Sequence, residues 1–241
     1  FTIASTGNAA DFGDMTQTMQ VAAEGSNSIR GLIMGGSNPG RQIEIDYITM
    51  ATTGNALDFG DLSAVRGNSG GTSSPTRAFA GAGAAPGMTA SVDMVEFAAL
   101  GTAIDFGDLT QARNNPSKGI VSSSTIGVWG GGRTPTLQNT IDYITMASLG
   151  DGADFGDLTD ARAYVSGFSN MTRGGFAGGY DPSASNIIDY ITIASTGNAT
   201  DFGDLGDAAA YGGGCSNAHG GIEAYDPRLV PVGSGRALYL S

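Results

Sequence analysis

Charged residues are scarce in this chain, and positive charge is scarcer still. They make up 14% of the 241 residues, with 11 lysines and arginines against 23 aspartates and glutamates, and a net charge of −12. Lys118 is the only lysine. Binding to nucleic acid or to an anionic membrane surface depends on clustered basic side chains. We therefore expect neither nucleic acid nor an anionic membrane as a partner.

Long apolar runs are absent, and cysteine and histidine are nearly so. No run approaches the roughly 20 apolar residues that cross a bilayer, and no basic stretch leads into an apolar one as in a signal peptide. We therefore predict no membrane insertion. Cys215 and His219 are single residues of their kinds, too few for a four-ligand zinc site. No nucleophile motif accompanies them, and we predict that the chain is not an enzyme.

Glycine is what the chain has in abundance. It supplies 40 of the 241 residues, more than twice the average share of roughly 7%. This much glycine weakens helices, and no strict Gly-X-Y period indicates collagen. The composition predicts an all-β protein with short strands and tight turns.

One internal repeat organises the sequence. The tetrapeptide Asp-Phe-Gly-Asp occurs five times, beginning at Asp11, Asp58, Asp105, Asp154 and Asp201. An element of the type IDYITM begins thirteen residues before four of these copies, at Ile45, Val92, Ile141 and Ile188. Each repeat holds four strand-like runs; in the fourth repeat they lie near 164–170, 174–180, 186–195 and 200–205. A period of 47 to 49 residues with this content is typical of propeller blades.

The two ends of the chain together make one further repeat. The repeats are 15–61, 62–108, 109–157 and 158–204, and residues 205–241 plus 1–14 complete a fifth. We predict a single domain over 1–241, a five-bladed β-propeller with four-stranded antiparallel blades. Sharing one blade between the termini closes the ring and removes free sheet edges. We expect glycine pairs such as Gly35-Gly36 in inner strands near the axis, and the repeated phenylalanines in pockets between blades.

These repeats resemble those of known protein families. The glycine doublet within a blade-length repeat resembles kelch-type propellers, although the usual downstream tryptophan is absent. The phrase DYITIASTGNATDFGDL, together with TRGGFAGGY, resembles tandem repeats in predicted bacteriophage virion structural and tail-fibre proteins, notably marine ones. The resemblance covers nearly the whole chain. It implies a component of the virion, with other virion proteins as partners, that displays a surface to the host.

The acidic residues have two interpretations. Fourteen of the 23 occupy three repeat positions. We favour a turn in Asp-Phe-Gly-Asp, in which the aspartate accepts bonds from nearby backbone N–H groups and glycine takes a positive φ. A kinase-like magnesium site is not expected, because no other kinase motif is present. The alternative is a ring of carboxylates around the axis that binds calcium; our prediction is no cofactor.

Basic residues recur at a position before the glycine-rich strand. These are Arg30, Arg77 and Arg173, with His219 in the last repeat. They could face a sugar or a carboxylate on one rim. We favour the other interpretation, in which each pairs with a repeat aspartate between blades, because a guanidinium suits a carboxylate.

Residues that break the repeat are the better candidates for ligand binding, since deviating loops can carry specificity on a repeated scaffold. We select Trp129, Arg133, Tyr180 and Tyr225. Aromatic rings beside polar side chains can stack on sugars. The alternative for Trp129 is that it fills space in the core.

These features favour a non-enzymatic module of a phage virion appendage, such as a tail fibre, that binds a host-surface receptor or glycan. One alternative is an architectural role in capsid decoration, at a capsid vertex or in tail assembly, without a ligand. Another is a polysaccharide hydrolase, for which nothing in the sequence singles out two carboxylates.

Overall fold

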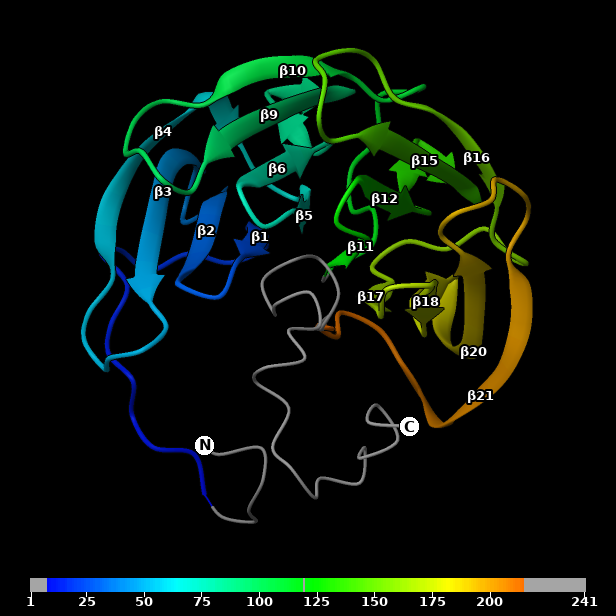
Figure 1. The fold of residues 1–241 in the computed structure, drawn as a ribbon. Coiled ribbons are helices and arrows are strands. Elements are labelled where there is room, and N and C mark those ends of the chain that lie inside the picture. The colour runs from blue at the N-terminus through cyan, green and yellow to red at the C-terminus, as the bar shows by residue number, and fades with distance from the viewer. Residues whose placement is uncertain (1–7, 119, 215–241) are drawn as a thin grey trace, which may run out of the picture.

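The computed structural model of the chain describes residues 8–118 and 120–214. In these residues the chain forms strands and no helix, so it contains no helix that could span a membrane there. Four twisted sheets stand side by side around a common centre (Figure 1). The all-β prediction is therefore confirmed.

We call the four sheets blades 1 to 4. Blade 1 contains β1 (Ala23–Ser26), β2 (Arg30–Ser37), β3 (Arg41–Thr49) and β4 (Leu57–Arg66). Blade 2 contains β5 (Gly70–Ser73), β6 (Arg77–Gly81), β9 (Ser91–Glu96) and β10 (Ile104–Asp108). Blade 3 contains β11 (Val121–Ser122), β12 (Ile126–Gly130), β15 (Thr140–Thr145) and β16 (Ala153–Asp157). Blade 4 contains β17 (Ser166–Ser169), β18 (Arg173–Ala177), β20 (Ser183–Thr192) and β21 (Thr200–Ala209).

Short strands extend the connections between second and third strands. They are β7 (Ala84–Ala85) with β8 (Gly87–Met88), β13 (Arg133–Thr134) with β14 (Thr136–Leu137), and β19 (Tyr180–Asp181), which pairs with β20. All pairings within the sheets are antiparallel, and the first strand of each blade lies nearest the centre while the fourth lies outermost (Figure 1). Four of the predicted blades are thus present; the fifth falls largely on residues 1–7 and 215–241, outside the described residues.

Antiparallel order gives the molecule two distinct faces. The turns that join first to second strands, and third to fourth strands, lie at one end of every sheet, which we call the turn face. The hairpins between second and third strands, and the connections to the next blade, lie at the opposite end, which we call the hairpin face. Loops from neighbouring blades therefore meet on each face.

The Asp-Phe-Gly-Asp motif forms a bulge in the outermost strand. Asp58 Oδ1 accepts a hydrogen bond from the N–H of Gly60 over 3.0 Å, and Gly60 has a φ of +143°. The same bond recurs at Asp11, Asp154 and Asp201. A Cβ on Gly60 would overlap the carbonyl oxygen of Gly101 in blade 2. The predicted side-chain bonding and positive φ are confirmed, in a strand bulge rather than a free turn.

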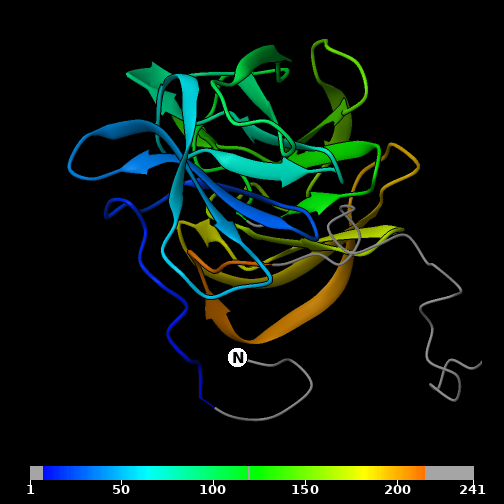
Figure 2. The ribbon, with the colours of Figure 1, turned by 60° about the vertical axis from the view of Figure 1, so that its left-hand side comes forward.

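The motif also joins each blade to the next one. Gly101 N–H donates to the carbonyl of Phe59 over 2.9 Å. The N-terminal segment makes the same contact, since Gly54 N–H donates to Phe12 O over 2.8 Å. This segment runs beside blade 1, in dark blue (Figure 2). Residues 11–14 therefore pack on blade 1 as an outermost strand packs on the following blade.

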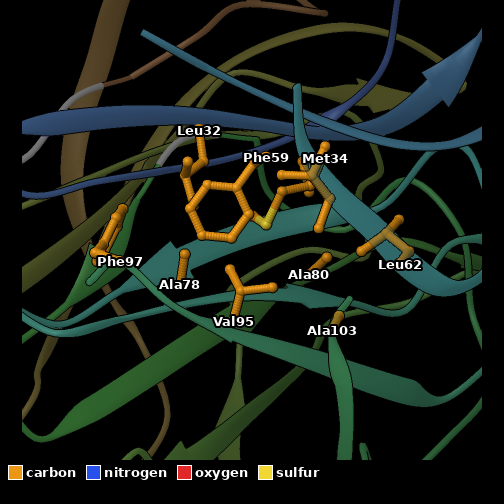
Figure 3. Close-up of a cluster of buried hydrophobic side chains, with 11 residues drawn as sticks. Leu32, Met34, Phe59, Leu62, Ala78, Ala80, Val95, Phe97 and Ala103 are labelled. Carbon is orange, nitrogen blue, oxygen red and sulfur yellow. The ribbon is translucent and has the colours of Figure 1, made fainter. Parts of the chain in front are cut away.

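Apolar side chains fill the space between neighbouring blades. Phe59 and Leu32 of blade 1 face Ala78 and Val95 of blade 2 in one such cluster (Figure 3). Two equivalent clusters join blades 2 and 3 and blades 3 and 4. The repeated phenylalanine is buried at Phe59, Phe106 and Phe155, as predicted. Phe12 and Phe202 are 36% and 64% exposed. The described residues place no other strands of the same sheet beside Phe12 and no following blade beside Phe202.

The glycine pairs lie at the hairpin face. Gly35 and Gly36 lie in β2, the second strand from the centre, near its end, with φ values of +62° and +120°. Gly178 and Gly179 repeat these values at +62° and +109°. Glycine is favoured there because L-residues rarely adopt such angles, and because a Cβ on Gly35 would lie 2.5 Å from the carbonyl oxygen of Arg66.

Candidate ligand-binding groove

A buried ion pair lies between each two neighbouring blades. Arg66–Asp93 joins blades 1 and 2, Arg113–Asp142 joins blades 2 and 3, and Arg162–Asp189 joins blades 3 and 4, at 3.2, 2.9 and 2.5 Å. A hydroxyl group from Ser63, Thr110 or Thr159 donates to the same aspartate over 2.6 to 2.7 Å. The repeat aspartates are thus distributed between blades, and the described residues contain no cluster of three or more potential metal ligands.

Burial makes these pairs sensitive to the loss of one partner. Burial lowers the pKa of Arg113, and its attraction to Asp142 opposes that change. Burial raises the pKa of Asp142, while Arg113 and Thr110 oppose the rise. Each charge therefore depends on the other, as expected for an ion pair removed from water.

Local side-chain bonding sets the shape of the turns on the turn face. Asn27 Oδ1 accepts from the N–H groups of Ile29 and Arg30 over 2.9 and 2.8 Å. Ser74 Oγ accepts from Arg77 N–H over 3.1 Å. Such Asx and Ser turns compete with regular structure and end the inner strand. The second strand then begins with Arg30 in blade 1 and with Arg77 in blade 2.

Both arginines reach the next blade. Arg30 Nη1 donates to the carbonyl oxygen of Phe97, and its guanidinium lies 4.9 Å from the centre of the Tyr47 ring. Arg77 Nη1 donates to Met146 O over 2.9 Å, and Nη2 lies 3.6 Å from Glu96. The prediction that these residues pair with repeat aspartates is wrong, because each guanidinium points along the turn face toward a turn of the next blade.

Arg173 holds the same position in blade 4. Its guanidinium lies 4.8 Å from the centre of the Tyr190 ring, which repeats the contact of Arg30 with Tyr47. Blade 3 has Ile126 at this position. The turn face therefore carries arginine on three of the four blades in the described part of the chain.

A groove of about 790 Å³ crosses the turn face of blades 1 to 3. Arg30, Arg77, Glu96, Thr76 and Ser124 contribute to its lining. Carbonyl oxygens of the neighbouring blades hold both guanidinium groups in place. Each guanidinium keeps further N–H groups that have no partner in the described residues. The hydroxyls of Thr76 and Ser124 likewise have no partner there. The groove thus offers fixed donors and adaptable hydroxyls, within the volume range of small-molecule sites.

Trp129 does not belong to a surface site. It is fully buried between blades 2 and 3, and its Nε1 donates to Gly70 O over 2.9 Å. A Cβ on Gly81 would lie 2.8 Å from the Trp129 ring. The ring occupies the space that these two glycines leave, which is the core-filling alternative, and no ligand in solvent can contact it in this structure.

The other selected residues lie away from the groove. Arg133 is exposed and Tyr180 is half-buried, and both lie on the hairpin face in equivalent hairpins of blades 3 and 4. Tyr225, like Cys215 and His219, lies outside the described residues. The structure thus brings Arg133 and Tyr180 to one face and separates both from Trp129.

Sequence reasoning missed the three arginines of the buried ion pairs. Arg66, Arg113 and Arg162 each follow the first aspartate of an Asp-Phe-Gly-Asp motif by eight residues. That spacing was a usable signal, because a basic residue at a fixed repeat position suits a repeated acidic partner.

No protein-family model matches this sequence, and no curated protein matches it either.

Proposed function

We propose that this chain is a non-enzymatic module of a phage virion appendage and binds a host-surface glycan in the turn-face groove. The groove itself carries this proposal. Its guanidinium groups are held by carbonyl oxygens of the next blade, so little ordering entropy is lost when they bind hydroxyl or carboxylate oxygens. The resemblance of the repeats to virion proteins supports the location on the virion.

The lining of the groove favours binding over hydrolysis. Glu96 is the carboxylate that the described residues contribute to it, and it is ion-paired with Arg77. Glycoside hydrolysis generally uses two carboxyl groups on opposite sides of the bond. We therefore expect no release of reducing ends when the protein is incubated with host polysaccharide.

A blocking substitution tests the groove without removing its contacts. Ser124→Trp places a large ring in the groove from an exposed turn, and Met171→Trp places the same ring on the equivalent turn of blade 4, which does not line it. We expect Ser124→Trp to weaken binding to isolated host-envelope polysaccharide by about ten-fold or more, a loss of about 1.4 kcal/mol, and Met171→Trp to leave binding unchanged.

Two results would count against the proposal. Equal binding by both variants would place any ligand elsewhere. Absence of binding by the unmodified protein, even when clustered on beads to gain avidity, would favour the architectural alternative.

The proposal includes a fifth blade, built from residues 205–241 and 1–14, that closes the ring. Phe202 is 64% exposed on the open side of blade 4, whereas the equivalent Phe155 is 3% exposed under blade 4. Residues 11–14 already pack on blade 1 as an outermost strand would. Deleting residues 1–14 should therefore expose sheet edges and cause aggregation; a monomeric protein with an unchanged thermal midpoint would contradict closure.

A further inference from the structure

Five equivalent residues take left-handed backbone angles where one blade leads into the next. They are Val21, Asn68, Asn115, Tyr164 and Tyr211, with φ between +50° and +64°. Backbone bonds link them in order: each N–H from Asn68 to Tyr211 donates to the carbonyl of the preceding member, over 2.9 to 3.3 Å. The blades thus present one repeated position around the centre of the hairpin face.

The backbone does not explain tyrosine at two of these positions. Asparagine adopts left-handed angles more readily than other non-glycine residues, whereas a bulky side chain strains the backbone there. Asn68 and Asn115 fit this preference, whereas Val21, Tyr164 and Tyr211 do not. The two tyrosines therefore require another reason, and their rings are what distinguishes them.

Four side chains gather at this place. The ring centres of Tyr164 and Tyr211 are 4.2 Å apart, with planes inclined by 39°. Tyr180 N–H donates to the carbonyl of Ala163, next to Tyr164, over 2.8 Å. Tyr211 is 66% exposed. We call Tyr164, Tyr180, Tyr211 and Arg133 the tyrosine cluster.

Arg133 adds an uncompensated positive charge to the cluster. Its backbone pairs with the backbone of Asn114. The next residue, Asn115, accepts a hydrogen bond from Tyr164 N–H at its carbonyl oxygen. Burial and the contact with Tyr211 raise the pKa of Tyr164, and the charge of Arg133 opposes the rise. Arg133 Nε donates to Pro135 O over 3.2 Å, and the described residues give it no acidic partner.

From this geometry we infer a second binding site on the hairpin face, in which the tyrosine cluster binds a saccharide that carries a carboxylate. The exposed tyrosine ring packs against the C–H face of a pyranose, and its hydroxyl bonds to sugar hydroxyls. The guanidinium of Arg133 binds the carboxylate through two N–H donors. This site is independent of the groove, which lies at the other end of the sheets.

The residues at the equivalent positions of the other blades support a binding role for the tyrosine cluster. Where blades 3 and 4 have Arg133 and Tyr180, blades 1 and 2 have Ser37 and Ala84. The protein as a whole is strongly acidic, which opposes an acidic ligand at long range. Salt screens that repulsion beyond about 8 Å at physiological strength, so the local guanidinium decides the contact.

Binding of the whole protein to oligogalacturonate and to its neutral methyl ester tests this site. We expect the acid to bind more tightly than the ester, by about ten-fold, as one charged hydrogen-bonded contact gives. Arg133→Gln should remove this preference. Arg41→Gln removes an equal charge from the hairpin face of blade 1 and should preserve it.

The tyrosine variants separate stacking from folding. Tyr211→Ala should weaken binding of both probes by about ten-fold, and Tyr211→Phe, which retains the ring, should keep most of it. Ser124→Trp in the groove should leave both unchanged. The proposed site would be overturned if the unmodified protein bound neither probe. It would also be overturned if the Arg133→Gln and Tyr211→Ala variants bound both probes as the unmodified protein does. Loss of binding in Ser124→Trp alone would assign the ligand to the groove.

Discussion

The three contacts between neighbouring blades differ from the contact between the N-terminal segment and blade 1 in one side chain. Each of the three has an aspartate held by a hydroxyl group and an arginine. At blade 1 the aspartate is Asp46 and the hydroxyl is Thr16, whose Oγ1 donates over 2.6 Å. Met19 stands where the arginine would be, eight residues after Asp11.

This difference shows that an interface of this kind can form without the arginine. Asp46 is as buried as its counterparts, but only neutral donors from Thr16 bond to it in the described residues. Neutral hydrogen bonds compensate a buried carboxylate less well than a guanidinium does. The N-terminal contact is therefore the weaker one, and we expect it to open before the contacts between blades.

The largest effect should follow from breaking an internal ion pair. Arg113→Met leaves Asp142 buried and unpaired, and we expect the free energy of unfolding in urea to fall by about 3–5 kcal/mol. Arg113→Met combined with Asp142→Leu should recover much of the loss, because no charge then stays buried. A single variant as stable as the unmodified protein would show that this pair does not hold blades 2 and 3.

A matched pair of glycine substitutions compares the two kinds of contact directly. A Cβ at Gly60 or at Gly13 would overlap a carbonyl oxygen of the following turn, Gly101 or Gly54. We expect Gly60→Ala to lower the free energy of unfolding by about 3 kcal/mol, since it strains an internal interface. Gly13→Ala should cost less than about 1 kcal/mol, because the segment can detach alone. Equal losses would refute the ranking of the contacts.

Supplying the missing arginine should strengthen the weak contact. Met19→Arg gives Asp46 the partner that its counterparts have, and we expect a gain of about 1–2 kcal/mol in the free energy of unfolding. Hydrogen exchange at the Gly54 amide, which donates to Phe12 O, should slow in parallel. Met15→Arg adds the same charge at an exposed position of the segment and serves as the control; an equal gain there would point to general electrostatics.

The smallest expected effect concerns Lys118, which forms hydrogen bonds at the inner end of the N-terminal segment. Its half-buried ammonium group donates to the carbonyls of Val21 and Ala22, each over 3.4 Å, and of Ser69. Burial lowers its pKa from 10.5 to about 8, and Glu24 opposes the change. Between these pH values the folded state has released a proton that the unfolded chain still holds, so stability rises with pH.

We expect that rise to be below about 1 kcal/mol, because solvent screens a half-buried group. Urea unfolding at pH 8, 9 and 10 measures it. Lys118→Met should remove this part of the pH dependence, and a fall in stability over the same range that depends on Lys118 would contradict the assigned direction.

The repeat made the architecture of the blades predictable. The predicted run near 164–170 contains β17, and the run near 174–180 overlaps β18, because glycine and Asx turns mark strand ends locally. The Asp-to-Gly bonding in the outermost strand was predictable for the same reason, since it involves residues two apart. The roles of Arg30 and Arg77 were not, because their partners lie 67 and 69 residues away.

The candidate site residues also divide into those that the sequence could indicate and those that it could not. Arg133 and Tyr180 were selected because they break the repeat, and the structure brings both to the hairpin face. Tyr164 and Tyr211 were not selected, since nothing in their sequence neighbourhood shows that they share a left-handed position and face each other. Trp129 also breaks the repeat, but Gly70 and Gly81 of the neighbouring blade bury it.

Composition, periodicity and bonds between near neighbours made the all-β class, the blade repeat and the Asp-to-Gly bond within Asp-Phe-Gly-Asp predictable from the sequence, whereas the bulge that contains this bond was found in the structure. The folded structure was needed to show which charges are buried in pairs, which arginines line a groove and which tyrosines meet. Those outcomes depend on how one blade packs on the next, and contacts between residues 25 to 70 positions apart leave little trace in local sequence.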